Sequence, residues 1–312
     1  MSARRGATDL SGILTIDKPR GMTSHDVVSR VRRITGERRV GHAGTLDPMA
    51  TGLLVVLVGP ATRLAPYLTM ARKSYEAHIV FGSQTDTDDA EGRTVATVPV
   101  PDEVVDPFFA TGTVASLIGF HEQVPPAYSA IKVDGKVAYR EARAGDALEL
   151  KPRAIEIVEA RLLGVQCEGE YAWDLELTVS KGTYIRSLAR DLGFALGTRA
   201  HLGALRRTRS GGLDISDAHS LADLEACADI RVLFADTGRA LDLPVVKLDR
   251  AAAERVANGR QLRADGFPLA PEGLVVLEHG NALLAIYEHT ADVLSPRCVI
   301  PGGVPDGDRS AL

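Results

Sequence analysis

The most constraining feature of this sequence is a glycine-rich loop, residues 39–52, that leads directly into a continuous apolar run. The loop holds three glycines, one proline, one histidine and one carboxylate, that of Asp47. The apolar run, residues 53–58, consists of leucine and valine and is closed by Gly59 and Pro60. A β-branched apolar run bounded by glycines is typical of a fully buried strand. We therefore expect a rigid loop, with one acid at its centre, anchored on a core strand.

Asp47 stands in an apolar setting. Leu46, Pro48 and Met49 flank it, and no lysine or arginine lies within seven positions on either side. A carboxylate in such surroundings needs a partner or takes up a proton. Either state is useful chemically, as a nucleophile or as an acid–base group. The alternative is an Asp-Pro turn in which the side chain satisfies nearby backbone N–H groups, and the spacing alone leaves both open.

Length and composition indicate a globular protein of one large domain or two. The chain has 312 residues, of which 45% are hydrophobic and 25% charged, both ordinary values for a globular chain. No apolar run reaches the roughly 18–20 residues needed to span a bilayer. The first residues lack the apolar segment of a signal peptide. We therefore expect a cytoplasmic protein with no membrane partner.

The charge is unevenly distributed along the chain. The net charge is −5, but residues 1–75 carry +7 and the remainder −12. A second basic island lies in the acid-free stretch 192–213. Its basic residues are Arg199, Arg206, Arg207 and Arg209. Two basic patches on an acidic body are what a localised polyanion site leaves in a sequence, although ordinary solvated arginine faces explain them equally well.

Neither a metal site nor a disulfide framework is expected. The three cysteines are widely separated, with no C-x-x-C pair and no zinc-ligand spacing. The acidic segment 84–92 suggests calcium, but Ala90 stands at the fifth ligand position of an EF-hand and Glu91 at its required glycine. We interpret this segment as a loop on the substrate side of a site.

Residues 41–52 resemble the signature of the TruB family, the bacterial tRNA pseudouridine-55 synthases. The family pattern is G-H-(T/A)-G-(T/A)-L-D-P-x-A-(T/S)-G, and the chain matches it throughout. A match of this length is far more specific than a lone glycine motif. The resemblance places the family's catalytic aspartate on Asp47 and implies an isomerase, an intramolecular transferase.

Two further segments carry the resemblance. Residues 12–19 resemble the family's first motif, whose lysine, here Lys18, supports the catalytic loop. Residues 73–75 resemble the K-x-Y motif, whose tyrosine, here Tyr75, stacks on the target uracil beside the aspartate. The residues alone leave open a plain surface lysine and an ordinary core-edge tyrosine.

Residues 180–193 read as a strand, a glycine turn, a cap at Thr183 and a helix. The expected inward residues are Ile185, Leu188, Ala189 and Leu192. The segment resembles a motif that pseudouridine synthases share, whose arginine, here Arg186, pairs with the catalytic carboxylate. A neighbouring guanidinium lowers the pKa of a carboxyl by roughly 1–3 and keeps it ionised. Tyr184 of the same motif is a candidate RNA contact, whereas Arg190 is expected to be an exposed helix arginine.

Residues 198–211 resemble the family's A-x-L-x-x-L-R-R-x-x-x-G segment, which combines an apolar edge with basic residues. Leu202 is expected to wall the uracil pocket. The candidate phosphate contacts are Arg199, Arg206 and Arg207. The loop 84–92 resembles a T-D-T-x-D-x-x-G loop near the family's site, and Asp89 in it is a candidate polar contact.

Periodicity predicts the elements between these motifs. A capped helix is expected from Thr23 or Ser24 to Gly36, and a half-buried strand over residues 73–82. Further expected elements are a short helix at 61–71, a helical insert at 99–112, strands at 155–165 and 173–179, helices at 216–228 and 251–258, and strands at 274–277 and 283–288.

The resemblance implies an α+β fold. A pseudouridine-synthase catalytic domain, with a mixed, mostly antiparallel sheet flanked by helices, is expected over residues 1–243. Residues 244–312 are expected to form a small, β-rich, PUA-like RNA-binding domain with a disordered tail from about residue 304. This last match is weak, and the segment is acidic.

Conversion of uridine to pseudouridine breaks the N1–C1′ bond, rotates the base and joins C5 to C1′. Because no redox change occurs, the resemblance implies no cofactor and no metal. The implied partner is the T-arm stem-loop of tRNA, bound by a monomer. The base must first be extruded, at a cost of a few kcal/mol, and His42 is expected to stack into the gap while Tyr75 stacks on the base. Whether Asp47 adds to the base, adds to the sugar or assists elimination stays open.

Two other functions fit parts of the sequence. A tRNA-binding or folding module without catalysis would use the same basic residues. A hydrolase would use Asp47 as its nucleophile and would need a general base or metal ligands, for which His42 is the local candidate. Release of tritium from 5-³H-uridine tRNA separates these functions from the isomerase.

Overall fold

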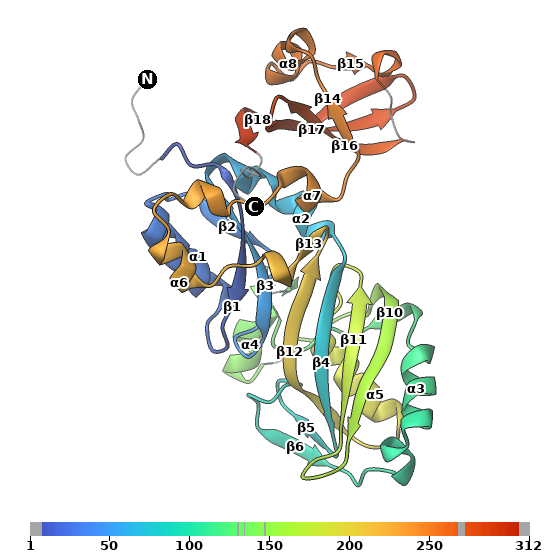
Figure 1. Ribbon diagram of the computed structural model, residues 1–312. Helices are drawn as coiled ribbons and strands as arrows, with labels where there is room; N and C mark the ends of the chain where they lie inside the picture. The colour runs from blue at the N-terminus through green and yellow to red at the C-terminus, as the bar shows by residue number, and fades with distance from the viewer. Residues whose placement is uncertain (1–7, 130, 134, 147, 268–271, 306–312) are drawn as a thin grey trace. The chain divides into compact units, whose positions relative to one another are not determined.

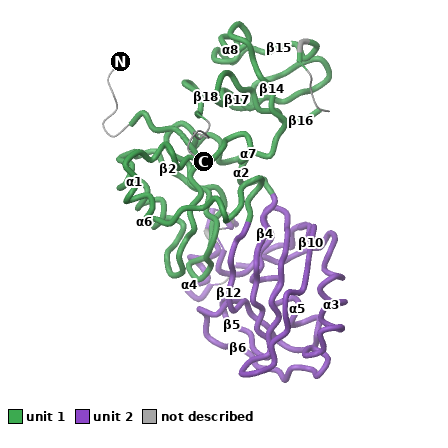
Figure 2. Tube along the Cα trace, in the orientation of Figure 1, with its two compact units in different colours: residues 1–71, 209–312 green, residues 72–208 purple. Residues whose placement is uncertain are grey.

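The computed structural model describes residues 8–129, 131–133, 135–146, 148–267 and 272–305. The chain divides into two compact units (Figure 2). Unit 1 combines residues 1–71 with residues 209–312, and unit 2 comprises residues 72–208. Unit 1 is therefore built from two separated stretches of sequence, whereas unit 2 is continuous.

The strand β3 (Thr51–Val58) is central to the N-terminal part of unit 1 (Figure 1). Both β1 (Gly12–Lys18) and β2 (Val40–Ala43) pair with it in antiparallel register. Its leucines and valines are buried, which confirms the predicted core strand. Gly59 ends the strand with φ at +64°, and a Cβ there would lie 2.0 Å from the carbonyl oxygen of Leu10, so glycine is required.

The helix α1 (Ser24–Thr35) shows the predicted start and stop signals. The Thr23 hydroxyl accepts a hydrogen bond from the Asp26 N–H, and the Asp26 carboxylate accepts one from the Thr23 N–H. This is a capping box. Gly36 ends the helix in the left-handed conformation. The inward residues Val27, Val28 and Val31 are buried, so the predicted helix and its apolar face are confirmed.

The segment after β3 is helical in two pieces. A 3-10 helix, η1 (Gly59–Leu64), precedes α2 (Ala65–Met70). Pro66 lies in the first turn of α2, where its missing N–H leaves no intrahelical hydrogen bond unmade. The predicted helix at 61–71 is therefore shorter than expected and begins with a tighter turn.

The chain returns to unit 1 through short elements. They are β13 (Leu213–Asp214), η3 (Ile215–Asp217), α6 (Leu221–Ala226), η4 (Ile230–Leu233) and α7 (Thr237–Leu241). The prediction of one helix over 216–228 is wrong. Ser220 and Asp223 form the capping box that starts α6, whereas Ser216 has no acid three residues later and lies in the preceding turn. The serine with the acidic partner therefore sets the helix start.

The C-terminal part of unit 1 is a sheet with the order β14-β16-β17-β18-β15. Its elements are β14 (Val245–Lys247), α8 (Arg250–Ala257), β15 (Leu262–Arg263), η5 (Ala264–Gly266), β16 (Gly273–His279), β17 (Ala282–Thr290) and β18 (Val293–Pro305). The first pair, β14 with β16, is parallel and the others are antiparallel. The predicted α8, β16 and β17 are confirmed, whereas β14, β15 and β18 were not expected. The expected disordered tail falls mainly on residues 306–312, outside the described residues.

The C-terminal sheet shares an apolar core with the N-terminal strands. Leu57 of β3 and Leu64 of η1 belong to the same buried cluster as Ile300 and Val304 of β18. The Arg63 guanidinium also donates a hydrogen bond to the carbonyl of Val299. The sheet therefore packs on the segment that follows the glycine-rich loop. The boundary expected between residues 243 and 244 stays a prediction.

Unit 2 contains a sheet with the order β12-β4-β11-β10-β7. Its strands are β4 (Lys73–Phe81), β7 (Gly119–Gln123), β10 (Arg153–Gln166), β11 (Ala172–Val179) and β12 (Ala200–Ser210). The pairings of β4 with β11, β11 with β10, and β10 with β7 are antiparallel. The predicted strands β4, β10 and β11 are confirmed, whereas β12 was not recognised as a strand.

Helices pack on this sheet. The helix α5 (Ile185–Ala195) contacts β4, and α3 (Pro107–Ser116) contacts β10. Trp173 of β11 is fully buried, with its ring edge-to-face on Phe81 at 4.9 Å and its indole N–H donating to the carbonyl of Val104 at 2.8 Å. The predicted helical insert at 99–112 corresponds to η2 (Asp102–Val105) followed by α3.

The remaining elements of unit 2 are small. They are β5 (Ser83–Thr85), β6 (Thr94–Thr97), β8 (Lys132–Val133), β9 (Lys136–Val137) and α4 (Ala138–Ala144). Across the described residues, no helix combines the length and apolar character needed to cross a membrane.

Candidate active site

Two hydrogen bonds from the Ser24 side chain hold one side of the loop around Asp47. The Ser24 hydroxyl accepts a hydrogen bond from the N–H of Leu46 at 2.9 Å and donates one to the carbonyl of the same residue at 3.1 Å. The Asp47 carbonyl accepts from the N–H of Ala50 at 3.1 Å, which closes a turn. The residue before the aspartate is therefore tied to the start of α1 by both of its backbone polar groups.

Lys18 fixes the other side of the loop. It is fully buried, and its Nζ donates to the carbonyls of Met22 at 2.7 Å, Pro19 at 3.0 Å and Pro48 at 3.3 Å. The Pro48 carbonyl also accepts from the N–H of Gly21 at 2.8 Å. A buried ammonium needs such acceptors. This excludes the plain surface lysine and fits the supporting role that the resemblance implies.

His42 lies on β2, opposite Val56 of β3 and five residues before Asp47. The strand β2 is tied to α1, because the Arg32 guanidinium donates to the carbonyl of Val40 at 2.7 Å. The exposed arginines of this region are Arg32, Arg33, Arg38 and Arg39. The structure therefore places His42 and a basic surface within the same unit as the Asp47 loop.

Tyr75 occupies a buried position of β4, in register with Leu177 of β11. Lys73 precedes it by two residues and shares its face of the strand. Burial, with the nearby charges of Arg207 and Lys181, lowers the pKa of the Lys73 ammonium to about 8. The tyrosine ring therefore shares its side of β4 with a buried amine that gives up its proton unusually easily.

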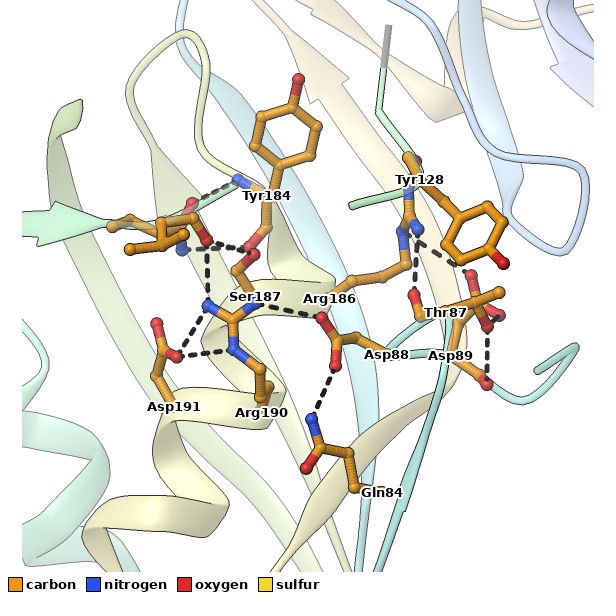
Figure 3. Close-up of polar contacts among 12 residues, drawn as sticks. Gln84, Thr87, Asp88, Asp89, Tyr128, Tyr184, Arg186, Ser187, Arg190 and Asp191 are labelled. Atoms are coloured by element: carbon orange, nitrogen blue, oxygen red, sulfur yellow. Dashed lines mark hydrogen bonds and ion pairs between the residues drawn. The ribbon is translucent and has the colours of Figure 1, made fainter. Parts of the chain in front are cut away.

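Arg186 stands in the first turn of α5 and is 5% exposed. Its guanidinium donates to the carbonyls of Thr87 and Tyr128, each at 3.0 Å, and its Nε lies 3.6 Å from Asp89 Oδ2 (Figure 3). The Asp89 carboxylate also accepts from the Thr87 hydroxyl at 2.6 Å. These contacts hold the arginine in one orientation and place a negative charge beside it.

The loop that holds Arg186 is joined to β12. Leu202 is fully buried and its N–H donates to the carbonyl of Asp88 at 3.0 Å, while its own carbonyl accepts from the N–H of Ala90 at 2.9 Å. Asp89, between these two residues, forms an isolated bridge with Leu202. Three residues predicted from the sequence, Arg186, Asp89 and Leu202, therefore meet at this loop.

Arg190 is not the exposed helix arginine that was expected. Its side chain is 15% exposed and lies 3.1 Å from the Asp88 carboxylate and 2.8 Å from that of Asp191. It also donates to the carbonyl of Val124 at 2.9 Å. The partner Asp88 is 102 residues away in the sequence, so the periodicity of the helix could not predict this contact.

The start of α5 also differs from the prediction. Thr183 does not cap the helix, because its hydroxyl donates to the carbonyl of Ser180 at 3.0 Å. Tyr184 takes the N-cap position, and its N–H donates to the Gln123 side chain at 2.9 Å. The Gln123 amide returns a hydrogen bond to the Tyr184 carbonyl at 3.1 Å. The ring of Tyr184 points away from Arg190 and its partners Asp88 and Asp191 (Figure 3).

The candidate phosphate contacts occupy different environments. The Arg199 guanidinium lies 4.6 Å from the centroid of the Phe194 ring and donates to the carbonyl of Thr198. Arg206 is partly exposed. Arg207 is only 1% exposed, so a contact between this side chain and RNA requires it to leave its present position. The role of these arginines stays a prediction.

Asp47 belongs to unit 1, whereas Tyr75 and Arg186 belong to unit 2. The pairing of Asp47 with Arg186, implied by the resemblance, joins residues of the two units and stays a prediction. No cluster of three or more His, Cys, Asp or Glu side chains is placed to hold a metal ion in the part of the chain that the structure describes.

The chain matches two protein-family models. Residues 32–185 match the TruB family pseudouridylate synthase (N terminal domain), and residues 186–245 match the tRNA pseudouridylate synthase B C-terminal domain. The first match contains Asp47 and Tyr75, and the second begins at Arg186. The residues singled out from the sequence therefore all lie inside these two matches, apart from Lys18.

Curated relatives match most of the chain. A tRNA pseudouridine synthase B of Thermobifida fusca is 45% identical over 296 residues, which cover 93% of this chain and 99% of that protein. Proteins of the same name from Leifsonia xyli and Mycobacterium tuberculosis are each 48% identical, over 280 and 259 residues. These alignments cover 85% and 82% of this chain and 91% and 85% of the relatives.

Solved structures share the fold. The crystal structure of a Cbf5-Nop10-Gar1 complex contains a chain with a TM-score of 0.71 and 25% identity, covering 95% of this chain and 87% of that one. The archaeal box H/ACA sRNP Nop10-Cbf5 complex contains another, with a TM-score of 0.68 and 23% identity over 93% and 86% of the two chains. The predicted α+β class with a β-rich C-terminal domain is thereby confirmed. From these family matches and relatives, this chain belongs to the TruB family of pseudouridylate synthases.

Proposed function

We propose that this protein is a tRNA pseudouridine synthase that isomerises uridine 55 in the T-loop, with Asp47 as its essential carboxylate. The observation that supports this most directly is the Asp47 loop. It matches the family signature throughout, and both neighbours of the aspartate, Leu46 and Pro48, are hydrogen-bonded to residues 18–24. A catalytic group needs such fixed support. The relatives named tRNA pseudouridine synthase B support tRNA as the substrate.

The reaction balances without an oxidant or an energy source. The N1–C1′ bond of uridine breaks, the uracil turns, and a C5–C1′ bond forms. The C5 proton is lost and N1 gains a proton, so the atoms of substrate and product are the same. The Asp47 carboxylate serves as the group that adds to the base or the sugar, or that assists departure of the base. Arg186 supplies the positive charge that keeps a carboxylate ionised.

Access to the uridine requires that the base leave the T-loop stack, which costs a few kcal/mol. We assign His42 to the gap that the base leaves. We assign Tyr75 to stacking on the extruded uracil, a contact worth roughly 1–3 kcal/mol, and to removal of the C5 proton. The partner is the T-arm of tRNA, bound by a monomer in the cytoplasm.

The substitution Asp47→Asn tests this function, because it removes the charge and keeps the shape of the side chain. Tritium release from 5-³H-uridine tRNA is expected to fall by at least about a thousandfold, while the Kd for tRNA changes by less than about twofold. Asp102→Asn, at an exposed position of unit 2, is the matched control and is expected to leave both unchanged. Appreciable turnover by Asp47→Asn would contradict the assignment.

The path of the RNA is tested separately. Arg199→Ala and Arg206→Ala are each expected to weaken tRNA binding and to flatten the plot of log affinity against log salt by about 0.7–0.9 for each phosphate contact removed. Arg161→Ala provides the control, because the Arg161 side chain on β10 is 67% exposed and pairs with Glu176 on β11. An unchanged salt slope in both test variants would move the RNA path elsewhere on the molecule.

A further inference from the structure

The first turns of α5 present three polar side chains to the same two segments of unit 2. Arg186, Ser187 and Arg190 all contact residues 84–89 or 124–128 (Figure 3). Arg186 and Arg190 are four residues apart and therefore lie on one side of the helix. Arg186 has a proposed role in the reaction, whereas the contacts of Arg190 are so far unexplained.

Arg190 and Ser187 converge on one carbonyl. The Ser187 hydroxyl and Arg190 Nη2 each donate to the Val124 carbonyl at 2.9 Å. Arg190 Nη1 lies 3.1 Å from Asp88 Oδ2, and the side chains of this pair are 15% and 9% exposed. The pair is therefore a largely buried ion pair that ties α5 to the 84–89 turn and to Val124 at once.

Asp88 stands between Thr87 and Asp89, two of the residues that contact Arg186. The Thr87 carbonyl accepts from Arg186 at 3.0 Å, and the Asp89 carboxylate lies 3.6 Å from it. The Asp88 side chain points the other way, to Arg190 (Figure 3). The two arginines therefore hold opposite sides of one three-residue turn, so we expect a change at Asp88 to shift two of the groups that orient Arg186, the Thr87 carbonyl and the Asp89 carboxylate.

The geometry at Asp88 is costly. Its φ is +59°, and residues other than glycine adopt this left-handed region only with strain. Burial raises the pKa of the Asp88 carboxyl above its usual value, although Arg190 and Gln84 act in the opposite direction. A buried ion pair is weak support for the fold, and strained backbone is concentrated at functional sites. These two features together indicate a role in geometry and not in stability.

We propose that the Asp88–Arg190 pair is a positioning device for Arg186. The pair fixes the turn at Thr87 and Asp89 and thereby the orientation of the Arg186 guanidinium during isomerisation. This inference rests on the proposed function of Arg186. Asp88 and Arg190 act through that arginine and are positioning residues, with no contact to the substrate required.

The test measures the single-turnover rate at saturating tRNA, the Kd for tRNA and the Tm. Asp88→Asn, Asp88→Gly and Arg190→Gln are each expected to lower the rate by about tenfold to a hundredfold, with the Kd changed by less than about twofold. The Asp88→Gly variant is the sharpest, because glycine adopts the left-handed turn freely and lacks the carboxylate. It also covers the case in which Asp88→Asn does not fold. A wild-type rate in Asp88→Gly would overturn the proposal.

Asp191→Asn is the matched control, because Asp191 contacts Arg190 from a side chain that is 44% exposed. It is expected to leave the rate within about twofold of wild type. A loss as large as that of Asp88→Asn would show that the charge around Arg190, and not the tie to the turn, sets the rate, and would overturn the proposal.

A double-variant cycle tests whether the effect passes through Arg186. In an Arg186→Lys background, Asp88→Asn is expected to cause little further loss of rate, because the group that it positions is already changed. Fully additive losses would overturn the proposal. Asp47→Asn, measured in parallel, separates the proposed function from the positioning role. Turnover by Asp47→Asn contradicts the proposed function. If Asp47→Asn is inactive and Asp88→Gly is fully active, only the positioning role is contradicted.

Discussion

Asp47 and Arg186 are held in place by different kinds of contact. Around Asp47, the Ser24 hydroxyl and the Lys18 ammonium bind backbone groups. Around Arg186, two backbone carbonyls are joined by buried charges: the Asp89 carboxylate lies beside the guanidinium, and the Asp88–Arg190 ion pair holds the same turn. The Asp47 loop contains no ion pair among these contacts, whereas the turn at residues 87–89 depends on two buried ion pairs that lose their support when one partner is removed. We therefore expect substitutions in the two regions to differ in their effects on stability and on the isomerisation rate.

Among substitutions of the residues that support the two sites, Lys18→Met is expected to have the largest effect on stability and rate. The variant leaves the Met22, Pro19 and Pro48 carbonyls without their buried donor, which should lower the free energy of unfolding by about 2–5 kcal/mol. Because the Asp47 loop loses an anchor, the isomerisation rate should also fall by about a hundredfold. Urea unfolding and tritium release measure the two quantities. Lys151→Met, at an exposed position, is the control, and equal stability of the two variants would show that the buried ammonium does not support the loop.

Ser24→Ala should have a smaller effect of the same kind. It removes the two hydrogen bonds to Leu46, and the expected loss is about 1–2 kcal/mol of unfolding free energy and about tenfold in rate. The comparison variant is Ser29→Ala, at an exposed position of the same helix, which should change stability by less than about 0.5 kcal/mol. If the rate of Ser24→Ala equals that of Ser29→Ala, the hydroxyl is not an anchor of the loop.

The smallest expected effect is the pH-dependent contribution of His78, in unit 2, to the free energy of unfolding. His78 alternates with Tyr75 along β4, so it lies on the opposite face, with its ring nitrogens 2.7 Å from Asp174 and 3.1 Å from Glu170. Burial lowers the pKa of the His78 imidazole, but its hydrogen bonds to the two carboxylates outweigh burial and the pKa is raised. The stabilising contribution is therefore complete below about pH 6.5, the unperturbed value, and disappears as the pH rises through the folded pKa.

His78→Gln should accordingly lower the free energy of unfolding by less than about 1 kcal/mol at pH 5.5 and by almost nothing at pH 9. Urea titrations at the two pH values measure the difference. The isomerisation rate serves as the internal reference, because no contact of His78 reaches the proposed catalytic residues among the described interactions. A stability loss that is the same at both pH values would argue against the charged histidine.

The elements that were predicted correctly are those whose sequence pattern lies within a few neighbouring residues. The start of α1 was predictable because Thr23 and Asp26, three residues apart, form the capping box by themselves. The core strand β3 was predictable because its apolar run is uninterrupted. The resemblance also pointed to Lys18, although its three carbonyl partners could not be read from its position in the sequence.

The predictions for Thr183 and Arg190 were wrong because each depends on a contact with a residue far away in the sequence. Gln123 binds the backbone of Tyr184 from 61 residues away, so the neighbouring Thr183 was wrongly given the capping role. Arg190 was taken for a solvated residue because Asp88 lies 102 residues away. In both places the loop segments 84–92 and 123–128 supply partners that only the folded chain brings to α5.

The discontinuity of unit 1 has a consequence for biosynthesis. Unit 2 is complete once residue 208 has left the ribosome, whereas the core around Leu57 also needs Ile300 and Val304. Domains fold as units while the chain emerges. The strand next to the Asp47 loop therefore lacks part of its apolar cover until β18 has been made. We expect the nascent enzyme to remain inactive until β18 has been made and packed on this core.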